Sequence, residues 1–227
     1  MITTKEKELQ GLKTIVKYFQ VARSLREGYE IPKYIKVEKD KIKMTDSTFL
    51  VELPNNFGLK EQYIEVDSFL EKNEMNHKYE RVYPNFEEVK INFENSYKFK
   101  LDIKEFLKKI RINYRKPESN IDMVFRIVKG RLYVYLRFRN YDYEYKKLGS
   151  IKISDFTNTN ARLILDPVKI VNLFRIFEKA EVKEIDVEFK SFHIREWKNK
   201  ESYREWIRKY PVKLTSENIY SLIMQRG

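Results

Sequence analysis

The chain of 227 residues has no cysteine, and only two histidines, six glycines and six prolines. Without cysteine it can form no disulfide, no cysteine-ligated zinc site and no thiol nucleophile. His77 and His193 lie far apart, and neither has a second ligand at metal-binding spacing on a shared helix. No glycine-rich phosphate loop, GxSxG or HExxH motif is present. These absences favour a protein that is not an enzyme and that uses no metal and no cofactor.

Long hydrophobic runs are also missing. No segment approaches the roughly 18 apolar residues of a transmembrane helix, and the N-terminal residues MITTKEKELQ lack the apolar region of a signal peptide. We therefore expect a soluble, cytoplasmic protein that lies outside the membrane, in the host cytoplasm if a phage encodes it.

Positive charge is in excess. The chain carries 46 Lys and Arg against 34 Asp and Glu, which gives a formal net charge of +12. A charge of this size favours a polyanionic partner, and nucleic acid is the commonest one, although charge alone does not demonstrate binding.

One pattern of apolar and basic residues occurs twice. In the second copy, the sequence from 99 to 115 predicts a strand, an N-cap at Asp102 and a helix. The apolar face of this helix consists of Ile103, Phe106, Leu107 and Ile110. The corresponding positions of the first copy are Leu12, Ile15, Val16 and Phe19. The repetition predicts one architectural unit that is present twice.

Strands and a second helix follow each copy. After a helix from Thr4 to about Ser24, the first copy has predicted strands at 34–37, 42–44, 49–53 and 63–66, and a helix at 68–73 with Asp67 as its cap. The second copy has a hairpin at 121–128 and 131–138, strands at 141–153 and 162–165, and a helix to Lys179 that begins with Asp166 and Pro167. We also expect a strand at 89–93, a short helix at 202–207, a strand at PVKL and a helical end from Ser216. The pattern predicts an α+β protein with two tandem domains, each with two helices packed on antiparallel sheet.

Basic residues lie on the helix faces away from the apolar ones. The candidate DNA-binding residues are Lys13, Lys17, Lys104, Lys108, Arg111, Arg115, Lys169, Arg175 and Lys179. A single stripe of this kind is typical of a solvated helix face, whereas equivalent stripes on repeated helices favour DNA. The tyrosines at 133, 135, 141, 143 and 145 leave two interpretations open, base stacking on a sheet and ordinary strand composition.

Three segments carry a resemblance to a known family. Thr45, Asp46 and Leu50 match a Thr-Asp-x-x-x-Leu motif, residues 79–84 (YERVYP) match Tyr-x-Arg-Val-x-Pro, and residues 211–214 (PVKL) are similar to a terminal Pro-Met-Arg-Leu. Together with the order of strands and helices, these segments resemble the bacterial beta sliding clamp, the ring that tethers a DNA polymerase to its template. The resemblance covers about residues 5 to 214, and the first domain of the family has no counterpart.

The resemblance implies a DNA-clamp fold with a first domain at 1–94, a second at 95–214 and a C-terminal tail at 215–227. It implies a processivity factor that encircles double-stranded DNA without sequence specificity and serves a DNA polymerase, with or without a clamp loader. Two domains per chain imply a homotrimer, and the short chain favours a phage or plasmid replication system.

The resemblance also implies a pocket for a partner peptide at Thr45, Leu50, Pro211 and Val212. We hypothesise that the apolar tail residues occupy this pocket in the free protein. Two alternatives to the ring remain open. One is a basic DNA-binding accessory protein that forms no ring, and the other is a nuclease, for which the sequence offers no metal-binding cluster.

Overall fold

The computed structural model describes residues 4–23, 33–46, 48–74, 96–110, 121–138, 144–155, 161–190 and 211–225, with side chains from residue 8 onward. The predicted strand at 89–93, the predicted helix at 202–207, the boundary between residues 94 and 95 and both histidines lie outside these residues. Within them, the α+β class is confirmed, because four helices accompany two antiparallel sheets.

The first repeat begins with helix α1 (Thr4–Ala22). A meander follows, formed by β1 (Tyr34–Val37), β2 (Lys41–Thr45) and β3 (Phe49–Pro54). Strand β4 (Gln62–Glu65) then returns to pair with β1, and α2 (Val66–Lys72) ends the repeat. The strand order is therefore β4-β1-β2-β3.

The second repeat has the same order of elements. Strand β5 (Tyr97–Asp102) leads into α3 (Ile103–Lys109), and the meander consists of β6 (Ile121–Val128), β7 (Arg131–Phe138) and β8 (Tyr145–Lys152). Strand β9 (Ala161–Leu165) returns to pair with β6 before α4 (Pro167–Lys179). The order β9-β6-β7-β8 corresponds strand for strand to the first repeat, so the predicted repetition is confirmed.

The end of the chain joins the two repeats. Strands β10 (Glu184–Phe189), β11 (Val212–Ser216) and β12 (Ile219–Ile223) continue the larger sheet, whose order is β4-β1-β2-β3-β12-β11-β10-β5. The separate tail and the helical end predicted after residue 214 are therefore wrong. Strand β12 pairs with β11 on one side and with β3 on the other, and its alternate residues Ile219, Ser221 and Ile223 are buried. Two ladders of backbone hydrogen bonds outweigh the weak helical propensity of this segment.

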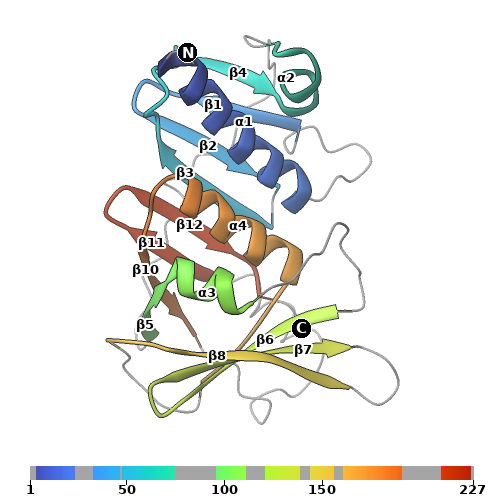
Figure 1. Ribbon diagram of the computed structural model, residues 1–227, viewed down its shortest axis with the longest axis vertical. Coiled ribbons are helices and arrows are strands. Elements are labelled where there is room, and N and C mark those ends of the chain that lie inside the picture. Colours follow the sequence, from blue (N-terminus) through green and yellow to red (C-terminus); the bar gives the residue numbers. More distant parts are fainter. Residues whose placement is uncertain are drawn as a thin grey trace.

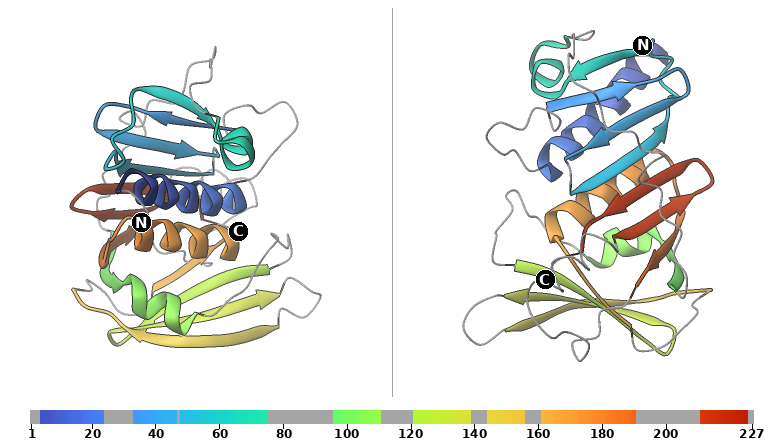
Figure 2. Two further views of the ribbon diagram at one scale, coloured as in Figure 1. Left: turned by 45° about the horizontal axis from the view of Figure 1, so that its top comes forward. Right: turned by 180° about the vertical axis from the view of Figure 1, so that it is seen from behind.

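Three of the helices form a layer on the larger sheet. Helix α4 packs against α1 on one side and against α3 on the other, and Figures 1 and 2 show α1 and α4 side by side. The predicted apolar positions of both repeated helices are buried or half-buried, and they belong to one core that extends through both repeats. The described helix α3 ends at Lys109, before Arg111 and Arg115, which lie outside the described residues.

The predicted caps differ in outcome. The Asp102 carboxylate accepts a hydrogen bond from the Glu105 backbone N–H (2.7 Å), and the Asp166 carboxylate accepts from Val168 and Lys169, so both caps are confirmed. Asp67 is not a cap, because α2 begins at Val66, two residues before the predicted start, and its cap position is Glu65. The Asp67 carboxylate instead accepts hydrogen bonds from Arg23 and Gln20 of α1.

Candidate nucleic-acid interface

The helix layer carries four of the predicted basic residues on its surface. Lys17 of α1, Lys104 and Lys108 of α3, and Lys179 of α4 are exposed, and Lys13 is half-buried. The apolar faces of α1 and α3 point into the core, which leaves these lysines on the solvent side. The helix layer therefore presents ammonium groups to solvent.

Lys169 does not belong to this surface. It is 8% exposed, and its ammonium donates to the Asp46 carboxylate and to the Thr48 hydroxyl of the first repeat. The same ammonium lies 5.3 Å from the centre of the Phe49 ring. A single apolar stripe predicts one buried helix face, but α4 lies between α1 and α3 and buries more than one. Asn172 is 2% exposed for the same reason, so the predicted open face of α4 is reduced to its C-terminal end.

Arg175 lies at that end of α4 and contacts the neighbouring helix. Its guanidinium lies 5.6 Å from the centre of the Tyr18 ring of α1, and the residue is half-buried. A cation over an aromatic face is attracted by the negative potential of the ring. Arg175 thus helps to hold α1 and α4 together and keeps part of its surface accessible.

The four residues predicted for a partner pocket are not all brought together. Thr45 and Leu50 are opposite each other on β2 and β3, and Leu50 is opposite Leu222 of β12. Val212 pairs with Ile223, one residue out of this row, and both belong to the main core. Because neighbouring residues of a strand point to opposite faces, Val212 lies on the helix side of the sheet and Leu50 on the other. Pro211 is buried just before β11.

Leu222 is one of the apolar residues near the end of the chain that were expected beside Leu50, and the structure places it there within a strand. Leu50 and Leu222 form a small apolar cluster, separate from the main core, with Tyr34, Tyr63 and Tyr220 packed around it. The alternation of Ile219, Ser221 and Ile223 with Tyr220 and Leu222 would have indicated a strand with two apolar faces. The cluster lies where the two repeats share a sheet, which the sequence alone does not reveal.

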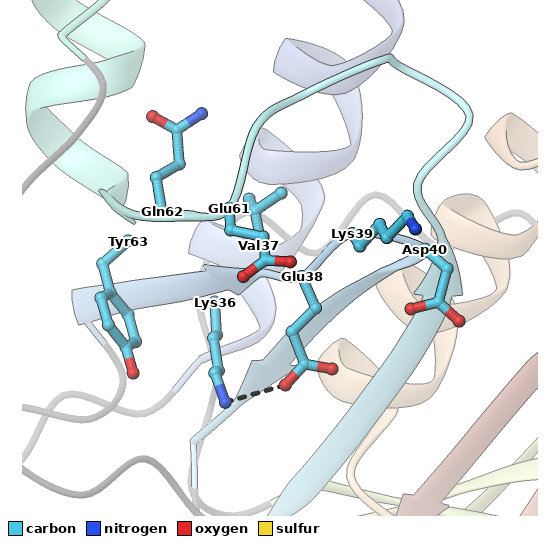
Figure 3. A pocket seen from close by; sticks show the side chains of 8 residues that line it. All are labelled: Lys36, Val37, Glu38, Lys39, Asp40, Glu61, Gln62 and Tyr63. Atoms are coloured by element: carbon cyan, nitrogen blue, oxygen red, sulfur yellow. Dashed lines mark ion pairs between the residues drawn. The ribbon is translucent and has the colours of Figure 1, made fainter.

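A hollow of about 590 Å³ lies beside the turn between β1 and β2 (Figure 3). Glu38 accepts from Lys36 (2.8 Å) and from Lys43 (2.7 Å). Burial raises the pKa of Glu38, but the hydrogen bonds and charges of the two lysines outweigh it, so the pKa lies below its usual value. The hydrogen bond to Glu38 raises the pKa of Lys36. Both shifts favour the charged forms of Lys36 and Glu38, so the hollow is lined by an ion pair.

Two further findings concern the described residues alone. No group of three or more metal-ligating side chains is close enough there to hold a metal ion. None of the described helices is both long and apolar enough to cross a membrane.

Comparison with known proteins shows similarity in structure. No protein-family model matches the sequence, and no curated protein matches it. The beta subunit of the DNA polymerase of Streptococcus pyogenes superposes over 96% of this chain and 64% of its own, with a TM-score of 0.59 and 11% identity. The beta sliding clamp of C. crescentus superposes over 96% of this chain and 64% of its own, with a TM-score of 0.63 and 11% identity. The DNA polymerase sliding clamp of Bacillus subtilis gives 96%, 63%, 0.62 and 16%.

The chain thus spans less than two thirds of the length of these proteins, while nearly all of it takes part in the match. Identities this low demonstrate a shared fold and nothing finer. The tandem repeats, the strand order and the structural comparisons lead to one conclusion: the chain has the fold of a bacterial beta sliding clamp.

Proposed function

We propose that the chain is a DNA polymerase processivity factor that acts as a sliding clamp on duplex DNA. The observation that carries this proposal is that exposed lysines lie on the helix layer of a clamp fold. Lysine ammonium groups attract phosphates over a long range without reading base sequence, so the protein can hold the duplex and still move along it. The protein acts by tethering in the cytoplasm, and it catalyses no reaction.

The proposed DNA-binding surface consists of the exposed lysines and the half-buried cations at its margin. The exposed members are Lys17, Lys104, Lys108 and Lys179, and the marginal ones are Lys13 and Arg175. Arg111 and Arg115 follow α3 in sequence and remain proposed members. Lys169 is left out because its charge is compensated by Asp46.

The proposed assembly is a ring of three chains with six repeats. Strand β3 of the first repeat is covered by β12, whereas β8, its counterpart in the second repeat, pairs only with β7 among the described strands. An open strand edge can pair with another chain, and a closed ring would give each β8 edge a partner at a chain-to-chain interface. The ring supports tethering because its hold on DNA does not depend on tight binding.

The proposed contact with the polymerase is the apolar cluster of Leu50 and Leu222. A short apolar peptide segment fits a cluster that is flanked by the three tyrosines 34, 63 and 220. Thr45 borders the cluster, whereas Val212 is left out because it is buried in the main core on the other face of the sheet. The proposal also includes a clamp loader that places the protein on DNA, and a phage or plasmid replication system in which it acts.

Replacement of Lys17, Lys104 and Lys108 by alanine tests the DNA surface. Log affinity falls linearly with log salt concentration, and each lost phosphate contact makes this slope shallower by about 0.9. The triple variant should therefore show a slope that is shallower by about 2 to 3. The measurement is a salt titration of duplex binding by fluorescence anisotropy.

The matched control replaces Lys39, Lys60 and Lys183, which are exposed and lie outside the helices. It removes the same charge and should leave the slope unchanged. Equal slopes for the two triple variants would contradict the proposed surface. The alternative function, a DNA-binding accessory protein without a ring, shares this surface and differs in the assembly.

A further inference from the structure

The four-stranded sheet β8-β7-β6-β9 has one face that no described helix covers. Its inner face packs against α3 and α4, as shown by Phe125 of β6, whose ring centre lies 5.9 Å from that of Phe106. In Figures 1 and 2 the sheet lies at the bottom of the molecule with helices on one side of it. The other side, here called the outer face, carries the residues that alternate with those facing α3 and α4.

The strand register identifies the residues of the outer face. Arg126 is opposite Arg162 on β9 and opposite Tyr133 on β7, and Tyr135 is opposite Lys147 on β8. The cations that this register places on the outer face are Arg126, Arg131, Arg137, Lys147, Lys152 and Arg162. Among the four described strands it places one carboxylate there, Asp122, which accepts from Arg137 (2.5 Å). The outer face is therefore strongly cationic.

Tyrosine rings stand among these cations. Tyr145 is 48% exposed, and its hydroxyl accepts a hydrogen bond from Arg162 Nη2 (3.1 Å), across the two strands that separate β8 from β9. Together with Arg126, Tyr135 and Val124, this pair lines a hollow of about 510 Å³. The Lys147 ammonium lies 5.0 Å from the centre of the Tyr133 ring. The hollow thus offers aromatic surface and guanidinium groups within one site.

We propose that the outer face binds single-stranded nucleic acid, with a base stacked on Tyr145 and phosphates held by Arg126 and Lys147. Base–aromatic stacking tolerates any sequence, and cations beside the rings hold the backbone. The bases of a duplex are already stacked on one another and cannot use the Tyr145 ring. An acidic peptide would form ion pairs with the cations through its carboxylates, but these carboxylates would not stack on the Tyr145 ring. The site lies on a different surface from the helix lysines, so it does not depend on the clamp function.

The test compares oligothymidine with an abasic oligomer of the same length and charge, by anisotropy on the full chain. Tyr145→Ala should weaken oligothymidine binding about fivefold or more, which corresponds to the lower end of the stacking range. The same change should leave the abasic oligomer unaffected. Tyr145→Phe keeps the ring and should retain binding. Arg126→Ala should weaken both oligomers, whereas Lys39→Ala, which removes an exposed charge elsewhere, should weaken neither.

Three results would overturn the proposal. Equal oligothymidine binding by the wild type and Tyr145→Ala would exclude stacking. Competition by polyglutamate as effective as by oligothymidine would show that the face recognises charge alone, as an acidic peptide site does. If the variant with Lys17, Lys104 and Lys108 replaced lost oligothymidine binding while Arg126→Ala kept it, the binding site would lie on the helix layer. Duplex binding by the Tyr145 variants reports separately on the proposed clamp function.

Discussion

The Lys169 ammonium and the Asp46 carboxylate form an ion pair that joins the two repeats. Both residues are buried, and the Asp46 carboxylate also accepts from the backbone N–H groups of Thr48 (2.9 Å) and Phe49 (3.0 Å). A buried charge is tolerated where opposite charge and hydrogen bonds compensate it. The pair therefore adds a buried electrostatic contact to the apolar packing that holds α4 on the first repeat.

Lys169→Met should lower the free energy of unfolding by about 3–5 kcal/mol, because it leaves Asp46 buried without its cation. Chemical denaturation of the variant measures this loss. Lys179→Met is the matched control, since Lys179 lies on the same helix and is exposed. A similar, small loss in both variants would mean that the pair contributes little.

Glu188 of β10 makes the free energy of unfolding decrease as the pH falls in the acid range. Its carboxylate accepts from the Ser96 hydroxyl (2.6 Å) and from Lys213 (3.0 Å). Burial raises the pKa of this carboxyl, but the hydrogen bonds from Ser96, Lys213 and Lys98 outweigh it and hold the pKa below the usual 4.5. The folded state therefore binds this proton less readily than the unfolded state.

It follows that Glu188 contributes its full stabilisation above pH 4.5 and loses it as the pH falls from there through the folded-state pKa. We expect Glu188→Gln to flatten the decrease in the free energy of unfolding below this pH. Denaturation of both proteins on either side of pH 4.5 measures the effect, and Ser96→Ala should produce part of it. An unchanged acid dependence in Glu188→Gln would assign it to other carboxyls.

At the scale of elements, β12 holds the larger sheet together. It pairs with β3 of the first repeat on one side and with β11 on the other, and the Ser221 hydroxyl donates to the Leu50 carbonyl oxygen (2.6 Å). Removal of this strand would expose the edges of β3 and β11 at once. The hypothesis places the end of the chain at the predicted pocket, and Leu222 does lie beside Leu50. Its displacement by a partner peptide stays a prediction, which the pairing of β12 on both sides disfavours.

Ser221→Pro should separate the halves of the sheet, since proline cannot donate to a ladder and does not fit a central strand. We expect faster amide hydrogen exchange in β3 and β11, and aggregation through the exposed edges. Thr215→Pro would disturb the same sheet from β11, and Ser221→Ala, which keeps the backbone N–H, should have a much smaller effect. Equal exchange protection in Ser221→Pro and the wild type would show that β12 is dispensable.

At the scale of the whole molecule, the two repeats form one body with a shared core and a shared sheet. The pairing of β3 with β12 within the chain suggests how β8, whose second edge has no partner among the described strands, would pair between chains. This geometry supports the proposed ring of three chains.

A ring should have the solution mass of three chains, each of 27.7 kDa. It should also stay on circular DNA at a salt concentration that abolishes binding to a linear duplex, and it should leave when the circle is cut. Light scattering and gel filtration of the protein with both DNAs measure these properties. A monomer that dissociates equally from both forms would favour the accessory protein without a ring.

The sequence determined the local structure of both repeats. The buried faces of α1 and α3 follow from apolar residues spaced three and four apart, and the caps at Asp102 and Asp166 follow from side chains that satisfy free N–H groups. The hairpin of β6 and β7 has its predicted bounds because Lys129 and Gly130 both adopt a positive φ in a two-residue turn. These features depend on neighbours in the sequence.

Which helix faces stay exposed depends on contacts between segments that are far apart in the sequence. Lys17 and Lys169 read alike as basic residues on amphipathic helices, yet one is exposed and the other is buried beside Asp46, more than a hundred residues away in the sequence. In the same way, Asp67 forms an ion pair with Arg23 and does not cap its own helix. The segment at 219–223 is a strand because it pairs with β3 and β11. Long-range charge pairing and strand pairing exceed local propensity in energy, and the partners that supply them are set by the fold.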